Sequence, residues 1–412
     1  NGGNSLYHDA TNFNIGAVDG VTGVRIGANN LTLSTSGSVT HAAAGNNISA
    51  LGLELLGTGG NYQLTDATNV ITNIAGNTGV VNYTNNASLV VGTVGANTGL
   101  TTSATMTLTV LGAGNNLTFN ATATPGAATT FNAPNNIIFN TGAGVTAVNA
   151  AGQTASFIAG NQIVGNANAA TDISAATANL NAANGIGAAN AIETTVANLI
   201  VTNSTGGNVV ITDTAGINID SASSAGNFSL TSTGSITTTG NLALNGLQSV
   251  IYANGSTSDL TLSSTVTHGA GAANLALRAD NSVFFTGTGN VTSTGGALEV
   301  TLNSDRDASG AGAIAMAAGS LMASNGGNVV LGGGVSPATT AAVGQGAKVH
   351  GVQISGANIN AGAGNVSIRG QSLAGAGTAH GVSIDGGSVL QASSGTITIT
   401  GTGAAATTTS RG

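Results

Sequence analysis

The chain of 412 residues lacks cysteine and tryptophan, and it has only three prolines and few charged residues. Without cysteine, neither disulfides nor thiol chemistry is available. Pro125, Pro134 and Pro337 lie outside the segments that look like strand cores, where a proline would remove a ladder hydrogen bond. Six basic residues in a chain of net charge −8 argue against a nucleic-acid-binding surface.

Long apolar runs are absent as well. No run reaches the ~18 residues needed to cross a bilayer, so we expect no transmembrane segment. Residues 1–5 carry neither a basic region nor an apolar segment, so no signal peptide is predicted there. Both ends read as interrupted repeat sequence, and an uncapped repeat of strands would expose open sheet edges. We therefore expect a processed chain or a fragment of a longer protein.

The sequence is rich instead in one recurring phrase: asparagine, an apolar residue, any residue, and a second apolar residue. Copies begin at Asn30, Asn116, Asn208, Asn227, Asn241, Asn274, Asn328 and Asn365. A longer match supports the repeat, because residues 30–40 read NLTLSTSGSVT and residues 227–237 read NFSLTSTGSIT. Repeats of this kind predict a chain that winds into a solenoid rather than a compact globule.

Apolar residues alternate with Thr, Ser or Asn inside these phrases, as in residues 106–110, MTLTV. A period of two predicts strands with one buried face, and no stretch shows a convincing helical period. Clusters of Gly, Asn and Ser between the phrases have the chemistry of tight corners. The sequence therefore predicts an all-β fold.

Two repeats near the C-terminus set the size of the unit. HGVQISG at 350–356 returns as HGVSIDG at 380–386, and each repeat contains three strand-like pieces separated by glycines. Three strands per turn predict a coil with a triangular cross-section. With roughly 18 to 30 residues per coil, the chain would make about 14 to 23 coils, and we expect one continuous β-solenoid over residues 1–412.

Two regions depart from this pattern. The stretch 167–198 is rich in Ala and Asn and is the least strand-like, so a short helix or irregular coils are expected there. In the C-terminal coils, 298–412, the segments 304–312, 336–350 and 371–380 interrupt the period without adding strand pattern. Loops on a rigid scaffold are common recognition sites, so these segments are candidates for binding.

Charged residues make up only 5% of the chain, and stacking explains why. Equivalent side chains in stacked strands repeat about every 4.8 Å, and two like charges at that distance repel by roughly 1 kcal/mol even in water. Thr, Ser and Asn can instead hydrogen-bond to their equivalents in the next coil. A stack of this kind favours neutral side chains.

Candidate chemical sites are few. The 14 acidic residues are scattered, and the only tight cluster is Asp305-Arg306-Asp307, which we interpret as a local charge pair on a solvated turn. His350 and His380 occupy equivalent places in consecutive repeats, so their rings are expected to stack, although two imidazoles without a third ligand make a weak metal site. We predict no catalytic, cofactor-binding or metal-binding residue.

Several segments resemble repeats of filamentous haemagglutinin-like large exoproteins. They are LELLGTGGNY at 53–62, residues 70–94, and NSDRDASGAGAIAM at 303–316 leading to NGGNVVLGGG at 325–334. The resemblance covers most of the chain. It implies a right-handed parallel β-helix, export from a Gram-negative bacterium by two-partner secretion, and a place on the cell surface in adhesion or as the shaft of a fibre.

These observations favour a secreted or cell-surface structural or adhesive rod, not an enzyme, whose loops meet a host or cell-surface glycan or protein receptor. Uncapped terminal coils would also let copies add end to end into filaments. Two alternatives remain. A carbohydrate-active β-helix enzyme would bring acidic residues together in one groove, and a passive spacer would leave binding to another part of a longer protein.

Overall fold

The computed structural model describes residues 3–403, and these residues form strands and no helix. Strands account for 55% of the chain, which confirms the predicted all-β fold. Residues 3–403 thus include no helix that is long and apolar enough to cross a membrane. The chain divides into two compact units, residues 1–197 and 198–412, and we describe each by itself.

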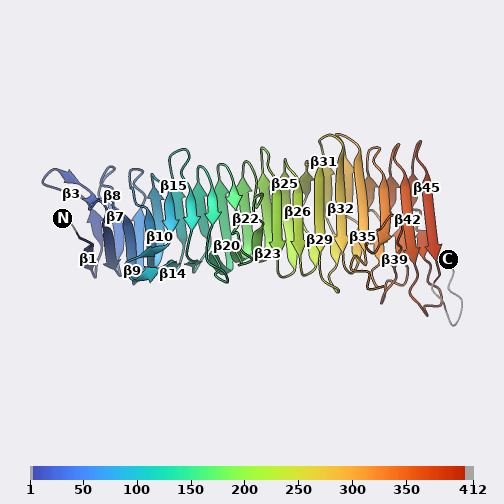
Figure 1. Ribbon diagram of the computed structural model, residues 1–412, viewed down its shortest axis with the longest axis horizontal. Coiled ribbons are helices and arrows are strands. Elements are labelled where there is room, and N and C mark those ends of the chain that lie inside the picture. Colours follow the sequence, from blue (N-terminus) through green and yellow to red (C-terminus); the bar gives the residue numbers. More distant parts are fainter. Residues whose placement is uncertain (1–2, 404–412) are drawn as a thin grey trace. The chain divides into compact units, whose positions relative to one another are not determined.

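The first unit consists of short strands that follow one another along the chain (Figure 1). They are β1 (Ser5–Asp9), β2 (Phe13–Ile15), β3 (Ala17–Val18), β4 (Val21–Thr22), β5 (Val24–Arg25), β6 (Asn30–Thr35), β7 (Ser38–His41), β8 (Ile48–Ser49), β9 (Gly52–Leu64), β10 (Asn73–Asn85), β11 (Leu89–Val91), β12 (Thr93–Val94), β13 (Asn97–Thr98), β14 (Leu100–Thr102), β15 (Met106–Val110), β16 (Leu117–Phe119), β17 (Ala123–Pro125), β18 (Thr129–Ala133), β19 (Ile137–Phe139), β20 (Val148–Ala159), β21 (Ile163–Val164) and β22 (Ile173–Ala182). Strand β23 (Ile192–Asn203) carries the chain into the second unit.

The second unit continues in the same manner. Its strands are β24 (Val209–Asp213), β25 (Ile217–Ser224), β26 (Phe228–Ser232), β27 (Ile236–Thr238), β28 (Leu242–Leu244), β29 (Gln248–Ala253), β30 (Leu260–Leu262), β31 (Thr265–His268), β32 (Ala273–Ala279), β33 (Val283–Phe285), β34 (Asn290–Ser293), β35 (Leu298–Ser304), β36 (Ile314–Met316), β37 (Leu321–Ala323), β38 (Val329–Gly333), β39 (Ala342–Val343), β40 (Val352–Ser355), β41 (Asn358–Asn360), β42 (Val366–Gln371), β43 (Val382–Asp385), β44 (Val389–Gln391) and β45 (Ile397–Thr402).

Parallel pairing between every third strand organises long stretches of both units. In the first unit β14 pairs with β17, β15 with β18 and β16 with β19. In the second unit β26 pairs with β29, β27 with β30 and β28 with β31. The chain thus returns to an equivalent position after three strands, and we call the chain between a strand and its parallel partner a layer. Two antiparallel hairpins, β3–β4 and β12–β13, depart from this scheme.

The interior of each unit is made of apolar side chains in register. Strand β15 shows the pattern that the sequence predicts, since its apolar residues are buried and its threonines are half-exposed. One interior column of the second unit comprises Ile211, Leu230, Ile251, Leu277, Leu302, Leu331 and Ile368. Each is at most 1% exposed, and full burial of such a side chain contributes roughly 1.5–3 kcal/mol.

Four phenylalanines form a cluster inside the first unit. Phe119 lies edge-on to Phe131, with ring centroids 4.9 Å apart, and stacks on Phe139 at 5.6 Å. Phe157 contacts both Phe131 and Phe139, at 5.3 and 5.5 Å. All four rings are essentially inaccessible to solvent. These separations are in the range that favours aromatic pairs beyond the area they bury.

Several of the repeated asparagines bond one layer to the next. The Oδ1 atom of Asn227 accepts a hydrogen bond from the backbone N–H of Gln248 at 2.9 Å, and Asn328 accepts one from Asn365 at 2.9 Å. The same bond joins Asn365 to Thr396 at 2.8 Å. Thus the asparagine of the phrase satisfies a main-chain donor at the beginning of the strand in the next layer, or one residue before it.

Layer length varies with the corners. The residues joined by this bond are 21 apart at Asn227 but 37 apart at Asn328. The longer separation exceeds the 18 to 30 residues that the repeat predicts, because residues 334–351 are inserted between β38 and β40. Insertions therefore change the connections and leave the strand register intact.

The stretch 167–198, where the sequence predicts a short helix or irregular coils, contains all of β22 and the beginning of β23. Alanines take up several of its interior positions, with Ala175, Ala178 and Ala182 all buried between larger residues such as Ile173 and Leu180. Since alanine differs little in hydropathy from the Ser and Thr beside it, the alternation of buried and exposed residues is hard to see in the sequence.

Candidate functional site

Three inserted segments of the second unit lie at one corner. They are residues 305–313 between β35 and β36, 334–351 between β38 and β40, and 372–381 between β42 and β43. Strands β35, β38 and β42 pair in that order, and so do β36, β40 and β43, so the three connections run side by side. We call these three segments the loop corner; Figure 1 shows them near β39.

Backbone hydrogen bonds join the segments of the loop corner to one another. Gly312 and Val343 exchange two N–H to carbonyl bonds of 2.9 Å each. The N–H of Leu373 donates to the carbonyl of Val349 at 2.8 Å. The loop corner is therefore a structured surface rather than a set of independent loops.

The acidic cluster in this corner differs from the prediction. Asp305 is only 3% exposed, and its Oδ1 atom accepts hydrogen bonds from Ser309 Oγ and from the N–H groups of Gly310 and Ala311 at 3.1, 2.9 and 3.2 Å. For Asp305 the interpretation as a charge on a solvated turn was wrong, whereas Arg306 beside it is half-buried and Asp307 is exposed. Three donors from its own loop satisfy the carboxylate, so it caps the loop without a counter-ion.

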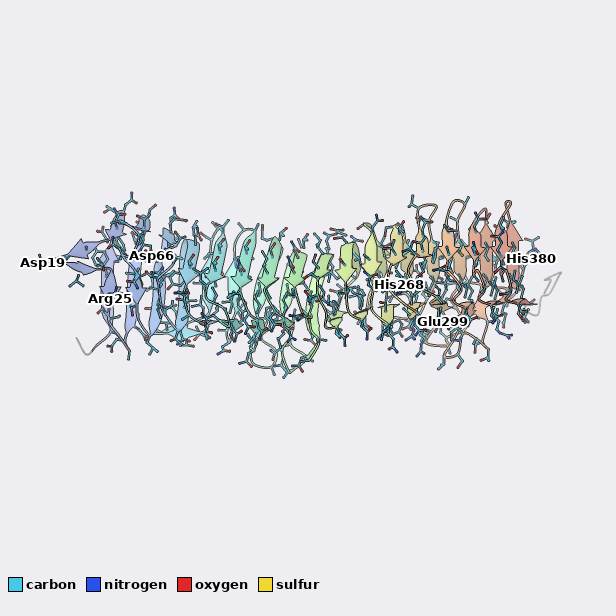
Figure 2. The ribbon with its side chains drawn as sticks, turned by 90° about the horizontal axis from the view of Figure 1, so that it is seen from above. Asp19, Arg25, Asp66, His268, Glu299 and His380 are labelled. Carbon is cyan, nitrogen blue, oxygen red and sulfur yellow. The ribbon has the colours of Figure 1, made fainter. Side chains whose placement is uncertain are left out.

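The two histidines of the C-terminal repeats stack as predicted. The rings of His350 and His380 have centroids 5.4 Å apart and planes 4° from parallel. The backbone N–H of His380 donates to Nδ1 of His350 at 3.0 Å, so that nitrogen is not free to bind a metal. Figure 2 places His380 among the last strands of the second unit. In residues 3–403 no three ligating side chains gather into a possible metal site.

Sequence reasoning missed one pair of acids in the first unit, Asp172 and Glu193. Asp172 is fully buried, and its carboxyl oxygens accept hydrogen bonds from the N–H groups of Asn166 and Glu193 at 3.2 Å. Its own N–H donates to the carbonyl of Glu193 at 2.8 Å. The two residues are 21 apart, which is one layer, and this spacing was the available signal.

Burial raises the pKa of Asp172 to about 8, and the neighbouring Glu193 carboxylate acts in the same direction while backbone donors oppose the shift. Burial also raises the pKa of Glu193, whose hydrogen bond with Asp172 works against the shift. The Oε2 atom of Glu193 is buried without a hydrogen-bond partner. At neutral pH the pair therefore holds a proton on Asp172.

Paired carboxyl groups are also the catalytic equipment of glycoside hydrolases, which place them about 5–9.5 Å apart around the sugar. In this chain the carboxyl groups of Asp172 and Glu193 hydrogen-bond to each other, which leaves no room for a substrate between them. Asp172 has no exposed surface. This geometry suits a structural pair rather than a catalytic one.

No family model, curated protein or solved structure matched this chain. The structure itself defines an all-β protein in which strands pair in parallel one layer apart. Columns of apolar side chains fill its interior, and its longest insertions lie in the loop corner. The case for function rests on these features.

Proposed function

We propose that both units are right-handed parallel β-helices of triangular cross-section, together making about 14 to 23 coils. The parallel pairing of every third strand supports three strands per coil. The asparagine bonds between layers support a repeat that continues through long insertions. This architecture is the one implied by the resemblance to filamentous haemagglutinin-like exoproteins.

The chain would serve as a structural and adhesive rod of a bacterial exoprotein, secreted or held at the cell surface. The observation that carries this proposal is the loop corner, where three insertions form one hydrogen-bonded surface on a rigid scaffold. Such surfaces are suited to recognising a partner, because the scaffold holds the loops in place. The partner would be a glycan or protein receptor on a cell.

Shortening the loop corner tests adhesion. We expect that replacing residues 374–378 with Asn-Gly will reduce the adherence of chain-coated beads to cultured epithelial cells by several-fold, because these residues are mostly exposed at the tip of their segment. Adherence is counted under flow, and circular dichroism checks the fold. The control variant carries the same replacement at 142–144, an exposed turn of the first unit. Equal adherence of both variants and the parent chain would contradict the proposal.

End-to-end association is part of the same proposal. Tyr7 and Ile399 are each 46% exposed, although their register partners Leu33 and Ile368 are buried in interior columns. Exposed column residues beside an unpaired strand edge favour addition of a further strand layer. We infer that a second copy of this chain supplies it, giving a head-to-tail contact that propagates.

Sedimentation velocity over a range of concentrations tests this contact. The parent chain is expected to form larger species as concentration rises, whereas Ile399→Glu should shift the distribution toward monomer because it places a charge on the exposed column. Leu247→Glu is the control, since Leu247 is 69% exposed but lies outside the strands. A parent chain that stays monomeric at every concentration would refute end-to-end addition.

A further inference from the structure

An outward-facing phenylalanine lies in a groove of the second unit. Eight of the twelve aromatic rings in the chain are fully buried, but the ring of Phe284 is half-exposed on the outer face of β33. Its register neighbours on β30 and β36 are Thr261 and Ala315, and Gln353 on β40 follows. The small Ala315 leaves a hollow between the ring and Gln353, and the groove has a volume of about 600 Å³.

A lysine of the loop corner forms one wall of this groove. The ammonium group of Lys348 lies 5.6 Å from the centroid of the Phe284 ring. Lys348 and Gln345 exchange backbone hydrogen bonds of 2.7 and 2.8 Å across a tight turn. The side chain of Gln345 in turn donates to Asn281 and to Ser282. Hydrogen bonds therefore hold the turn of residues 345–348 in place, and this turn positions the Lys348 ammonium group over the ring.

Polar groups complete the groove on β40. Gln353 offers an amide, and Ser355 offers a hydroxyl. Hydrogen bonds from Ser355 and Ser383 hold the pKa of Asp385 below its usual range, so this carboxyl group stays ionised. Because the Ser355 hydroxyl group donates its hydrogen bond to Asp385, its oxygen is left as an acceptor for a hydroxyl group of a ligand.

We propose that this groove binds a glycan that carries a carboxylate, which names the partner class of the adhesive surface and so rests on the proposed function. The apolar C–H face of the sugar ring packs on Phe284, the carboxylate pairs with Lys348, and sugar hydroxyl groups bond to Gln353 and Ser355. Asp385 repels negative charge from the other end of the groove, which fixes the direction of the sugar.

The net charge of the chain further restricts the class of glycan that the groove can bind. A net charge of −8 disfavours highly charged polyanions such as sulfated chains, whereas one carboxylate beside one lysine remains favourable. An aromatic ring, a single cation and uncharged hydrogen-bonding groups match a uronic-acid type of sugar better than a peptide, which would need main-chain partners. The groove offers no open strand edge for a peptide, because β33 is paired on both sides.

Titration calorimetry with two matched saccharides tests the groove. The probes are a glucuronate-containing hexasaccharide and the same hexasaccharide with its carboxyl groups reduced to alcohols. The parent chain is expected to bind the first at least about tenfold more tightly than the second, and 0.5 M salt should narrow the difference. Equal affinity for both probes, or binding of neither, would overturn the proposal.

Three substitutions assign the binding to the groove. Phe284→Ala and Lys348→Gln are each expected to weaken binding of the acidic probe by about tenfold, and Lys348→Arg should retain most of it. The control is Arg25→Gln, which removes a positive charge from the first unit, where Arg25 donates to Asn47 at 2.9 Å. Equal weakening by the control would show a nonspecific charge effect and overturn the site. If neither the parent chain nor any variant binds the probe while coated beads still adhere to cells, the proposed glycan site is refuted but the proposed adhesive function is not.

Discussion

Raising the pH from about 4 to about 8 is expected to reduce the free energy of unfolding of the first unit by several kcal/mol. The cause is Asp172, which is fully buried and shares a proton with Glu193. Ionisation of Asp172 would place a second negative charge beside Glu193 on a carboxyl group that has no exposed surface. The folded chain therefore keeps the proton that the unfolded chain releases.

The direction of the effect follows from the two pKa values. Asp172 has a pKa of about 8 when folded and 3.8 as an ordinary aspartate, so protonation favours the folded state. Its stabilising contribution is complete below pH 3.8 and is lost as the pH rises through about 8. At roughly 1.4 kcal/mol for each pKa unit, the loss over this window is several kcal/mol.

Denaturant unfolding between pH 4.5 and 9 measures the effect. Asp172→Asn should flatten the profile, because an asparagine does not ionise, although its amide nitrogen replaces one of the two oxygens that accept backbone N–H groups. The variant is expected to be less stable than the parent chain at pH 4.5 and to lose less stability than the parent chain between pH 4.5 and pH 9. Asp19→Asn is the control, since Asp19 is exposed in the turn between β3 and β4 (Figure 2). A slope in Asp172→Asn equal to that of the parent chain would show that another group is responsible.

Phe131→Ala is expected to cost about 3–5 kcal/mol of unfolding free energy, the usual loss for a buried phenylalanine. Phe131 is fully buried and contacts both Phe119 and Phe157, so truncation leaves a cavity and removes two ring contacts. Phe284→Ala is the matched control, because the same change on the outer face should cost under about 1 kcal/mol. Chemical denaturation monitored by circular dichroism compares the two variants.

The two variants carry the same substitution and differ only in whether the phenylalanine lies in the interior or on the outer face. If Phe131→Ala and Phe284→Ala destabilised the chain equally, the interior cluster would not be the close-packed core that its ring distances indicate. A loss at Phe131 confined to about 1 kcal/mol would mean that the surrounding layers collapse into the cavity. Either result would revise the view that interior columns set the stability of the first unit.

The all-β fold was predictable from sequence because its signals are local. Alternation in residues 106–110 and the recurring asparagine each report on a single strand and its corner. The stacking of His350 on His380 was also predictable, since equivalent places in neighbouring repeats come into register. Within 167–198 the signal failed, because alanines take up several interior positions there and hide the alternation.

The candidate sites were less accessible to sequence reasoning, since they depend on the exact register between layers. Asp172 and Glu193 read as isolated acids until a register of 21 residues brings them together. Asp305 read as a solvated charge, but its burial depends on where residues 309–311 fold back over it. Lys348 reaches Phe284 because the inserted turn lies against residues that precede it by 64 positions in the chain. The hydrogen bond from Gln345 to Asn281 spans the same separation.

The asparagine bonds between layers have a direction. Asn69 and Asn85 accept from the backbone of the earlier residues Ile48 and Ile71, but in eight other pairs the side chain of the earlier residue accepts from the backbone of the later one. The pairs are Asn4 with Asn30, Asn12 with Ser38, Asn116 with Asn136, Asn227 with Gln248, Asn241 with Thr265, Asn290 with Leu321, Asn328 with Asn365, and Asn365 with Thr396. A formed layer thus presents ready acceptors to the chain that follows it. In these eight pairs the order of the layers is therefore written into the hydrogen bonds, with the acceptor on the earlier layer and the donor on the later one.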